Sequence, residues 1–518
     1  MKTCDVFVKS MFLIILPSTG QPVNAQGDWE TLLPLGDPNG ILLDIQETSM
    51  GYTCLYGSSA ENVHQTQLIP ISSEGEPLSY SVLADGVNNS FGATSILMGN
   101  DSSLHVVTGS YKDDVPQSHG TVHFKCTLEG DMISSTPTSH FSGYTPLFTT
   151  IGSWISDSTF VIPISARVGP GPGFGMLNRV AVATYHENGS LLNDTLYNFP
   201  GDAVFRYPYH AVDPGDGNIL ISMHGGWEFF DGMGMTHFVE FDQDLNHVGG
   251  FATPTVNGNS VFEPDSILRE GLFITLLSDG SFLTSGRYQT PSNGTRSAIL
   301  RYDEDGGTIA NYLPQSGYMN DYPAYYQSHD FSVDNRVVFA YVEHYDPFPF
   351  GTGTPEHPSN IHIVKLDTLL TPQCDLVING FDDNFYYMLH RIKWTSDGGV
   401  ILIGSRRDLN TTEPPVPWVR KIAPNDCLTG IHETQPGEQE VTVFPNPGTN
   451  GFTLQIQGPV VQAGKVQLHD MQGRLVRSVP LRSSQAYMPA EDLAPGLYLY
   501  RVIDSMGRPI TDGKWVRE

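Results

Sequence analysis

The chain has 518 residues, in which 56 Asp and Glu outnumber 27 Lys and Arg, for a formal net charge of -29. This acidity excludes a nucleic-acid-binding protein, which needs a basic surface to displace counterions, and it disfavours binding to an anionic membrane surface. The length allows two or three domains.

Residues 1–25 are predicted to be a secretory signal peptide. Lys2 and Lys9 supply positive charge, residues 11–16 form a short apolar run, and residues 23–25 resemble a small-residue cleavage site. The apolar run is too short to span a bilayer, and no other stretch of the sequence is long and apolar enough. We therefore expect an exported protein without a transmembrane segment.

Four cysteines follow the predicted signal peptide: Cys54, Cys126, Cys374 and Cys427. An even number in an exported chain suggests disulfides, but the sequence does not choose among the three pairings, and buried thiols are the alternative. The spacing of a zinc site is absent from the sequence.

One phrase recurs along most of the chain: a turn led by Asp, then a short apolar strand that ends in small residues. The copies begin at Asp101, Asp157, Asp216, Asp279, Asp334 and Asp397, with a degenerate copy at Met50. Their separation is slightly larger than the roughly 40–50 residues of propeller repeats.

Each repeat contains about four short strands separated by Gly, Asp, Asn and Pro turns, without helical periodicity. Residues 28–428 are thus predicted to form an all-β β-propeller of about seven four-stranded blades. The last unit supplies only three strands before Cys427, while a spare strand stands at residues 29–33. We expect this N-terminal strand to complete the last blade.

Residues 429–440 are predicted to be a linker, and residues 441–518 alternate with period two, as in a small β-sandwich. This block contains Phe444-Pro445-Asn446-Pro447, the turn at 470–474, Pro495-Gly496-Leu497-Tyr498 and Gly513-Lys514-Trp515-Val516. Together these motifs resemble the type A C-terminal sorting domain of the type IX secretion system. The resemblance implies that residues 441–518 engage the type IX machinery. It also implies that the passenger is secreted or held on the outer-membrane surface of a Gram-negative bacterium.

Superposing the repeats brings basic and imidazole side chains to comparable positions. Arg167, His224, Arg287, His344 and Arg406 come near the end of the second strand, and His210, His329 and His390 lie in first strands. If the blades close, these residues are predicted to meet at one mouth of the central channel. Such a ring would hold a carboxylate, sulfate or acidic sugar, or a metal through the histidines. The alternative is that they are solvated strand ends.

Acidic turns at Asp213/Asp216, Asp242/Asp244 and Asp303/Asp305 raise the question of calcium. The true Asp-x-Asp runs lack the distal Glu of an EF-hand loop, and Asp also favours turns through its own hydrogen bonds. We therefore predict no cofactor, with calcium or another divalent metal as the alternative.

Fold alone does not decide function. The leading prediction is an extracellular, non-catalytic module that binds a glycan or a protein ligand. The alternative is a polysaccharide-acting hydrolase or lyase at the channel mouth, which a carboxylate pair with one raised pKa would favour. A purely structural surface component is a third possibility.

Overall fold

The structure is a computed structural model of the full chain. It describes residues 27–33, 35, 37, 40–60, 63–84, 89–112, 115–138, 141, 143–168, 178–197, 205–215, 217–226, 235–252, 268–269, 273–290, 294–314, 321–332, 335–344, 355, 357–424, 427, 440–457, 464–470, 474–481, 485–503 and 509–518. The predicted signal peptide and Asp216 lie outside the described residues.

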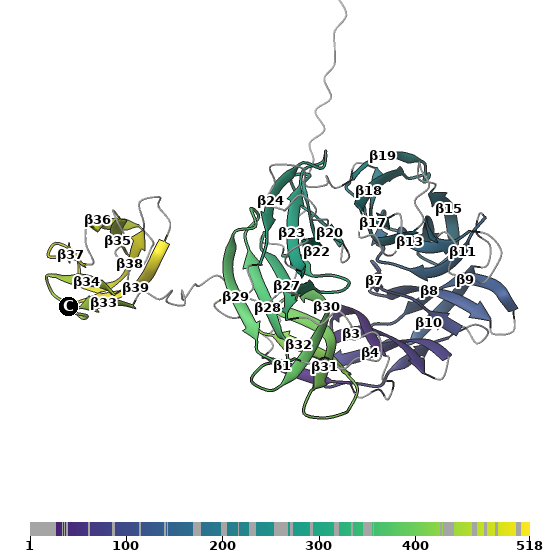
Figure 1. The fold of residues 1–518 in the computed structure, drawn as a ribbon, viewed down its shortest axis with the longest axis horizontal. Coiled ribbons are helices and arrows are strands. Elements are labelled where there is room, and N and C mark those ends of the chain that lie inside the picture. The colour runs from purple at the N-terminus through teal and green to yellow at the C-terminus, as the bar shows by residue number, and fades with distance from the viewer. Residues whose placement is uncertain are drawn as a thin grey trace, which may run out of the picture. The chain divides into compact units, whose positions relative to one another are not determined.

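The described chain is all-β and divides into two compact units, residues 1–429 and residues 430–518. The first unit contains seven antiparallel sheets of four or five strands within its described residues, which we number in chain order. Figure 1 shows these sheets following one another around a shared middle, from purple to green.

Sheets 1 to 4 come from the first half of the chain. Sheet 1 contains β2 (Ile41–Thr48), β3 (Gly51–Ala60), β4 (Val63–Ser72) and β5 (Ser81–Leu83). Sheet 2 contains β6 (Asn89–Phe91), β7 (Leu97–Met98), β8 (Leu104–Lys112), β9 (Val115–Cys126) and β10 (Met132–Thr138). Sheet 3 contains β11 (Thr145–Thr149), β12 (Ser153–Trp154), β13 (Thr159–Arg167), β14 (Asn178–His186) and β15 (Leu191–Tyr197). Sheet 4 contains β16 (Phe205–Val212), β17 (Asn218–Gly226), β18 (Met235–Asp242) and β19 (His247–Ala252).

Sheets 5 to 7 complete the first unit. Sheet 5 contains β20 (Leu268–Arg269), β21 (Ile274–Leu276), β22 (Phe282–Thr290), β23 (Gly294–Tyr302) and β24 (Thr308–Tyr312). Sheet 6 contains β25 (Asp321–Pro323), β26 (His329–Phe331), β27 (Val337–Glu343), β28 (Asn360–Leu366) and β29 (Pro372–Ile378). Sheet 7 contains β30 (Phe385–Trp394), β31 (Val400–Asp408), β32 (Val416–Ile422) and the N-terminal β1 (Trp29–Leu32).

Three copies of the Asp-led turn, at Asp101, Asp279 and Asp397, pair the carboxylate of the Asp with a cation on the next strand but one of the same sheet. Asp279 accepts hydrogen bonds from the backbone N–H (3.1 Å) and hydroxyl (2.6 Å) of Ser281, and Arg301 pairs with the same carboxylate. Gly280 supplies the positive φ of 86° that the turn requires. Equivalent ion pairs join Lys125 to Asp101 (2.7 Å) and Lys421 to Asp397 (2.8 Å).

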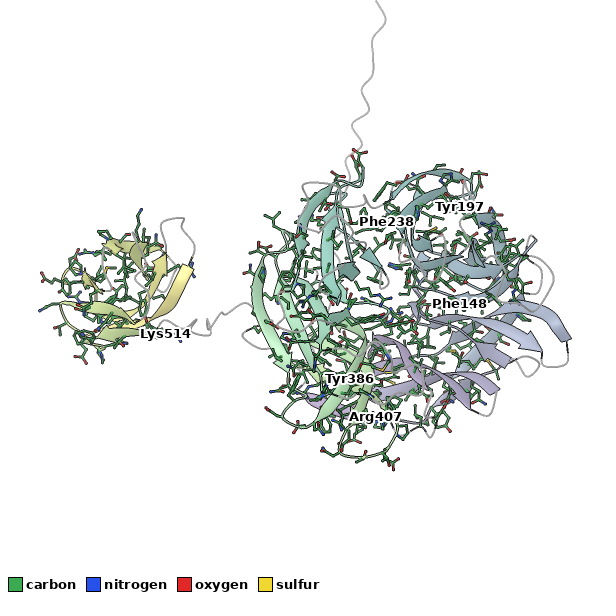
Figure 2. The ribbon with its side chains drawn as sticks, viewed as in Figure 1. Phe148, Tyr197, Phe238, Tyr386, Arg407 and Lys514 are labelled. Atoms are coloured by element: carbon green, nitrogen blue, oxygen red, sulfur yellow. A yellow bond between two sulfur atoms is a disulfide. The ribbon has the colours of Figure 1, made fainter. Side chains whose placement is uncertain are left out.

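Apolar side chains fill the joint between every two successive sheets. One buried cluster lies between sheets 1 and 2, and further clusters follow at each joint up to sheets 6 and 7. A seventh cluster joins sheet 7 to sheet 1 through Ile401, Ile403 and Tyr52. Figure 2 marks Tyr197, Phe238 and Tyr386 among these packed aromatic side chains.

The predicted pairing of the N-terminal strand with the last unit is confirmed. β1 pairs antiparallel with β32, from Trp29 opposite Lys421 to Leu32 opposite Trp418. The Trp29 indole also donates to the Ser73 carbonyl (3.0 Å) and packs against Tyr52 of sheet 1, with ring centroids 5.8 Å apart. The strand therefore links sheet 7 to sheet 1.

A disulfide joins Cys374 on β29 to Cys427, which follows β32. Cys54 and Cys126 are buried free thiols. Both alternatives left open by the sequence therefore occur: two of the four cysteines form a disulfide, and the other two are buried thiols.

The C-terminal unit is a two-sheet β-sandwich. Sheet 8 contains β33 (Glu440–Phe444), β34 (Gly451–Gln457) and β37 (Gln485–Pro489). Sheet 9 contains β35 (Gly464–His469), β36 (Leu475–Leu481), β38 (Gly496–Ile503) and β39 (Pro509–Arg517). Trp515 is buried in its core and donates to the Pro445 carbonyl at 3.0 Å, which ties the last strand to the segment after β33. Within the part of the chain that the structure describes, no helix has the length and apolar character to cross a membrane.

Deleting residues 26–36 is expected to lower the melting temperature of the protein by several degrees or more. The deletion removes the edge strand of sheet 7, the Trp29 contacts with sheet 1 and the ion pairs of Glu30. Differential scanning calorimetry of the full chain, with exposed Glu74→Gln as control, measures the change. An unchanged melting temperature would show that β1 contributes nothing to stability.

Candidate functional site

The strand register places five of the predicted site residues at the same end of the strands in their sheets. Each stands opposite, or directly beside, the beginning of the first strand of its own sheet. The pairs are Arg167 with Thr145, His224 with Tyr207, Arg287 with Arg269 and Arg406 with Tyr387, while His344 follows Glu343, which faces Asp321. We call these five residues the strand-end set. The side chain of His224 lies outside the described residues.

Arg406 is held in place by acidic and aromatic neighbours. Its guanidinium pairs with Glu30 of β1 and lies over the Phe385 ring, 4.2 Å from the ring centroid. Arg420 of β32 pairs with the other oxygen of Glu30 at 2.8 Å. Glu30 therefore connects the N-terminal strand to two cations of its own sheet.

These residues line a groove of about 330 Å³ between β29 and sheet 7. Its walls combine guanidinium, carboxylate and aromatic groups: Asp28, Glu30, Asp383, Phe385, Tyr387, Arg406 and Arg420. Such a mixture provides both charge-assisted hydrogen bonds and an aromatic surface for a polar ligand.

The other described members of the strand-end set are half-buried. The Arg287 guanidinium lies 5.3 Å from the centroid of the Tyr322 ring, in sheet 6. The Arg167 Nε is buried and has no hydrogen-bond partner among the described residues. The His344 ring stacks on His357 and Phe381, and its Nδ1 lies 3.1 Å from the Pro358 carbonyl.

The three first-strand histidines lie in the interior instead. His210, His329 and His390 are at most 5% exposed. His210 accepts a hydrogen bond from the Ile274 N–H (3.0 Å), and its ring stacks on Phe273 at 4.1 Å, which also contacts His329. His390 donates from Nδ1 to the Leu42 carbonyl at 2.7 Å.

Burial keeps these histidines neutral. It lowers the pKa of His329 to about 3 and that of His390 to about 4. Burial also lowers the pKa of His210 well below its usual range, and the charge of Arg391 acts in the same direction. At neutral pH the three imidazoles therefore add no positive charge to the strand-end set.

Arg391, on β30 directly after His390, forms the centre of this interior. Its guanidinium is 1% exposed and donates to the Leu43 carbonyl (2.5 Å), to the Thr94 carbonyl and to Gln327 Oε1 (3.1 Å). Asp44 lies 3.5 Å from its Nε. One buried side chain of sheet 7 thus contacts residues of sheets 1, 2 and 6.

Asp44 completes the buried pair from sheet 1. It accepts hydrogen bonds from the Ile45 N–H (2.7 Å) and from the Ile96 N–H of sheet 2 (2.8 Å), and Lys393 Nζ lies at 2.8 Å. Burial raises the pKa of the Asp44 carboxyl, but Arg391, Lys393 and these hydrogen bonds outweigh burial and hold the pKa below its usual value. The pair is therefore charged at neutral pH.

Comparable polar contacts join the inner part of every two successive sheets, and we call them the polar belt. Besides the Asp44 and His390 contacts, it contains Thr149 N–H to Gly92 O (3.0 Å), Ile151 N–H to Tyr209 O (3.0 Å), Ile274 N–H to His210, Ser285 Oγ with Ser328 Oγ (2.5 Å), and Tyr325 N–H to Leu389 O (2.9 Å).

Sequence reasoning identified His210 but missed the equivalent residues Asp44 and Arg391. All three stand six residues before the recurring turn of their repeats, at Asp216, Met50 and Asp397. Each follows directly after an irregularity in the pairing of the first strand. The sequence signal was therefore a polar residue at the same distance before the turn in each of these repeats. Because the residue type differs between repeats, a search for one residue type does not detect it.

The acidic turns use their carboxylates as backbone acceptors. Asp242 accepts from Asn246 N–H at 2.7 Å, and Asp303 accepts from Asp305 N–H at 3.1 Å and Gly307 N–H at 2.6 Å. Among the described residues, no group of three or more His, Cys, Asp or Glu is arranged to hold a metal ion.

Asp330 has a raised pKa for a structural reason. Burial raises the pKa of its carboxyl to about 6, against the opposing effect of hydrogen bonds from the Trp394 N–H (2.7 Å) and the Phe331 N–H (2.9 Å). Its described contacts are with backbone groups and not with a second carboxylate.

Residues 442–512 match the family described as the secretion system C-terminal sorting domain. This match confirms the resemblance of the C-terminal block to the type IX sorting domain, and it implies secretion or location at the cell surface. No curated protein matches the chain significantly in sequence.

Several solved structures are similar to this chain at low identity. A protein of unknown function from Dyadobacter fermentans is 13% identical, with a TM-score of 0.41, over 64% of this chain and 94% of that one. The polysaccharide lyase Uly1 is 10% identical, with a TM-score of 0.45, over 74% and 89%. A fungal alcohol oxidase in complex with copper is 13% identical, with a TM-score of 0.43, over 95% and 100%. At these scores the similarities assign no activity to this chain.

Arg391→Leu and Asp44→Leu are each expected to lower the free energy of unfolding by about 3–5 kcal/mol, because each leaves a buried charge short of its partner. The double variant should lose less than the sum of the two losses. Urea unfolding of the full chain measures all three, with Lys125→Gln, which removes a partly exposed ion pair, as control. Strictly additive losses would show that the two side chains do not interact.

Asp330 should make its own contribution to the pH dependence of stability. Because its folded pKa lies above the ordinary value of 3.8, it favours folding at low pH, and this contribution is lost as the pH rises through about 6. Asp330→Asn removes the effect. The stability of this variant relative to wild type should therefore be about 2 kcal/mol higher at pH 7.5 than at pH 4.5. A pH-independent difference in urea unfolding would contradict the shift.

Proposed function

We propose that the seven sheets of the first unit are the blades of a closed β-propeller spanning residues 28–428. Two features support this: an apolar cluster at each of seven joints, including the joint between sheets 7 and 1, and a polar belt that follows the same cycle. The pairing of β1 with β32 would then complete the last blade and protect its edge.

We further propose that this propeller is a non-catalytic binding module for an anionic ligand, most simply an acidic glycan, exported through its type IX sorting domain. The observation that carries this proposal is the shared register of the strand-end set. In a chain of net charge -29, three arginines recur at the same strand ends of sheets 3, 5 and 7. Closure of the ring would bring these strand ends around one mouth.

The surroundings of the arginines fit a carboxylate or sulfate on a sugar. Arg167 retains a buried Nε without a described partner, and Arg287 and Arg406 each lie over an aromatic ring. Guanidinium groups bind planar anions through paired, charge-assisted hydrogen bonds. The groove beside Arg406 supplies aromatic side chains for the sugar ring.

A hydrolase or lyase fits the described residues less well. The interior histidines are neutral and committed to packing, and Asp330 is bound to backbone N–H groups. We therefore assign His210, His329 and His390 to the inner core and place the ligand at Arg167, Arg287, Arg406 and His344.

The full chain is expected to bind oligogalacturonate or dextran sulfate and not neutral dextran. Arg167→Gln with Arg287→Gln should raise the dissociation constant tenfold or more, because two guanidinium contacts are lost. Isothermal titration calorimetry measures the change. The charge-matched control replaces exposed Arg474 and partly buried Arg477 of the sorting domain, as Arg474→Gln with Arg477→Gln.

Equal affinity of wild type and the double variant would refute the site, and no binding of either polyanion would refute the ligand class. Shortening of oligogalacturonate during incubation with the wild type would instead establish the hydrolase or lyase.

A further inference from the structure

The outer face of sheet 9 presents a mixed row of cationic and aliphatic side chains. In register across its four strands, Leu475 faces His469, His469 faces Leu499, and Leu499 faces Lys514. Neighbouring positions on the same face extend this row, and together they form what we call the basic face: Lys465, Gln467, His469, Leu475, Leu497, Leu499, Arg501, Lys514 and Val516. Asp512 stands opposite Arg501 in the same register.

Because side chains alternate in direction along each strand, the basic face points away from the core of the sandwich. Val466, Leu468 and Trp515 are fully buried, so the residues between them point away from the sandwich core. Lys465, Arg501 and Lys514 are exposed, and Lys514 is labelled in Figure 2. The basic face therefore belongs to the solvent-facing side of the sheet.

Large apolar side chains are exposed among these cations. Leu475 is 53%, Leu499 38% and Val516 37% exposed. Three exposed aliphatic side chains on one flat sheet are typical of a surface that becomes buried in a complex. Leu475 and Val516 stand on the two edge strands of sheet 9 and Leu499 on a central strand, so aliphatic and cationic positions are mixed across the basic face.

Charge separates the sorting domain from the rest of the chain. Residues 441–518 contain eight Lys and Arg against six Asp and Glu, for a net charge of +2, whereas residues 1–440 contain 19 against 50, for -31. Within the sandwich, the described outward residues of sheet 8 are uncharged: Thr442, Phe444, Thr453, Gln455, Gln485 and Tyr487. Among the side chains that the structure describes, the two sides of the sandwich are therefore unlike in charge.

We propose that the basic face is the surface through which the sorting domain docks onto an acidic protein surface of the export machinery. Charge complementarity identifies the partner as acidic, and the exposed aliphatic side chains supply an area that can be desolvated. Electrostatic attraction between the two surfaces would favour productive encounter and orient the sandwich.

A protein partner fits this face better than a lipid surface. Sequence segments that bind anionic membranes cluster about 4–8 Lys and Arg, or place them along an amphipathic helix. The basic face has three exposed Lys and Arg, spread over three β-strands and interrupted by leucine and valine. Its mixture of exposed aliphatic and cationic side chains is that of a protein interface.

The test uses the full chain, with its signal peptide, in a bacterial host that has a type IX secretion system. Lys465→Glu with Lys514→Glu should reduce the exported fraction at least fivefold, as measured by immunoblots of periplasm, cell surface and medium. Lys465→Arg with Lys514→Arg should keep export at the wild-type level. Deletion of residues 441–518 sets the baseline without export.

The matched control places two glutamates on the opposite side of the sandwich, as Thr442→Glu with Gln485→Glu, and should leave export unchanged. Melting temperatures of the purified full-length variants verify folding. Wild-type export of the Lys→Glu variant would overturn the proposal, as would an equal loss of export in the control.

A lipid partner is tested separately with vesicles of phosphatidylglycerol and phosphatidylcholine at physiological salt. We expect the full chain not to sediment with them. Sedimentation that is lost in the Lys465→Glu, Lys514→Glu variant would overturn the protein partner in favour of an anionic lipid surface.

Discussion

The buried ion pair between Arg391 and Asp44 is the interaction on which the inner part of the first unit depends. Removing two charges from water is costly, and the attraction between them compensates only if their remaining hydrogen bonds are satisfied. Here carbonyl groups of Leu43 and Thr94 and the amide of Gln327 satisfy the guanidinium, and backbone N–H groups satisfy the carboxylate. Because these groups come from sheets 1, 2, 6 and 7, the pair stabilises one arrangement of the N-terminal and C-terminal sheets over others.

The joint between sheets 7 and 1 is reinforced more than once. Hydrogen bonds of β1 extend sheet 7, Trp29 reaches across to Ser73 of sheet 1, and Lys393 donates to the Ile45 carbonyl at 2.7 Å. The disulfide between Cys374 and Cys427 anchors the end of the first unit to sheet 6. In the proposed propeller the two ends of the ring would meet at this joint, and these contacts would hold them together.

The sequence predicted the all-β character of the chain well, because local turn and strand signals determine it. The absence of a fourth strand before Cys427 correctly indicated that Trp29–Leu32 pairs there. The strand-end set was found from the number of residues between each Asp-led turn and the basic or imidazole residue. Equal spacing along paired strands corresponds to equal positions in the sheets. The burial of the histidines could not be predicted from the sequence. A histidine in a first strand has the same local sequence pattern whether it faces solvent or is fully buried, as His329 is. The Arg391–Asp44 pair joins residues nearly 350 positions apart, so no local pattern could reveal it.

The two units differ in net charge, and they therefore differ in how strongly they attract or repel an anionic ligand or partner. Residues 1–440 carry a net charge of -31, so an anionic ligand approaching them is repelled except where cations are gathered and acidic neighbours are already paired. Arg406 shows the difficulty, because Glu30 holds it together with Arg420, and an anionic ligand must compete with that carboxylate. The Nε of Arg167 has no hydrogen-bond partner among the described residues, and Arg167 is therefore better placed to bind charge. The sorting domain, at +2, meets no such barrier, and its cations lie on a face that already carries exposed apolar groups. An acidic passenger and a basic-faced sorting domain in one chain would therefore present unlike surfaces, so that an acidic docking partner discriminates between them by charge alone.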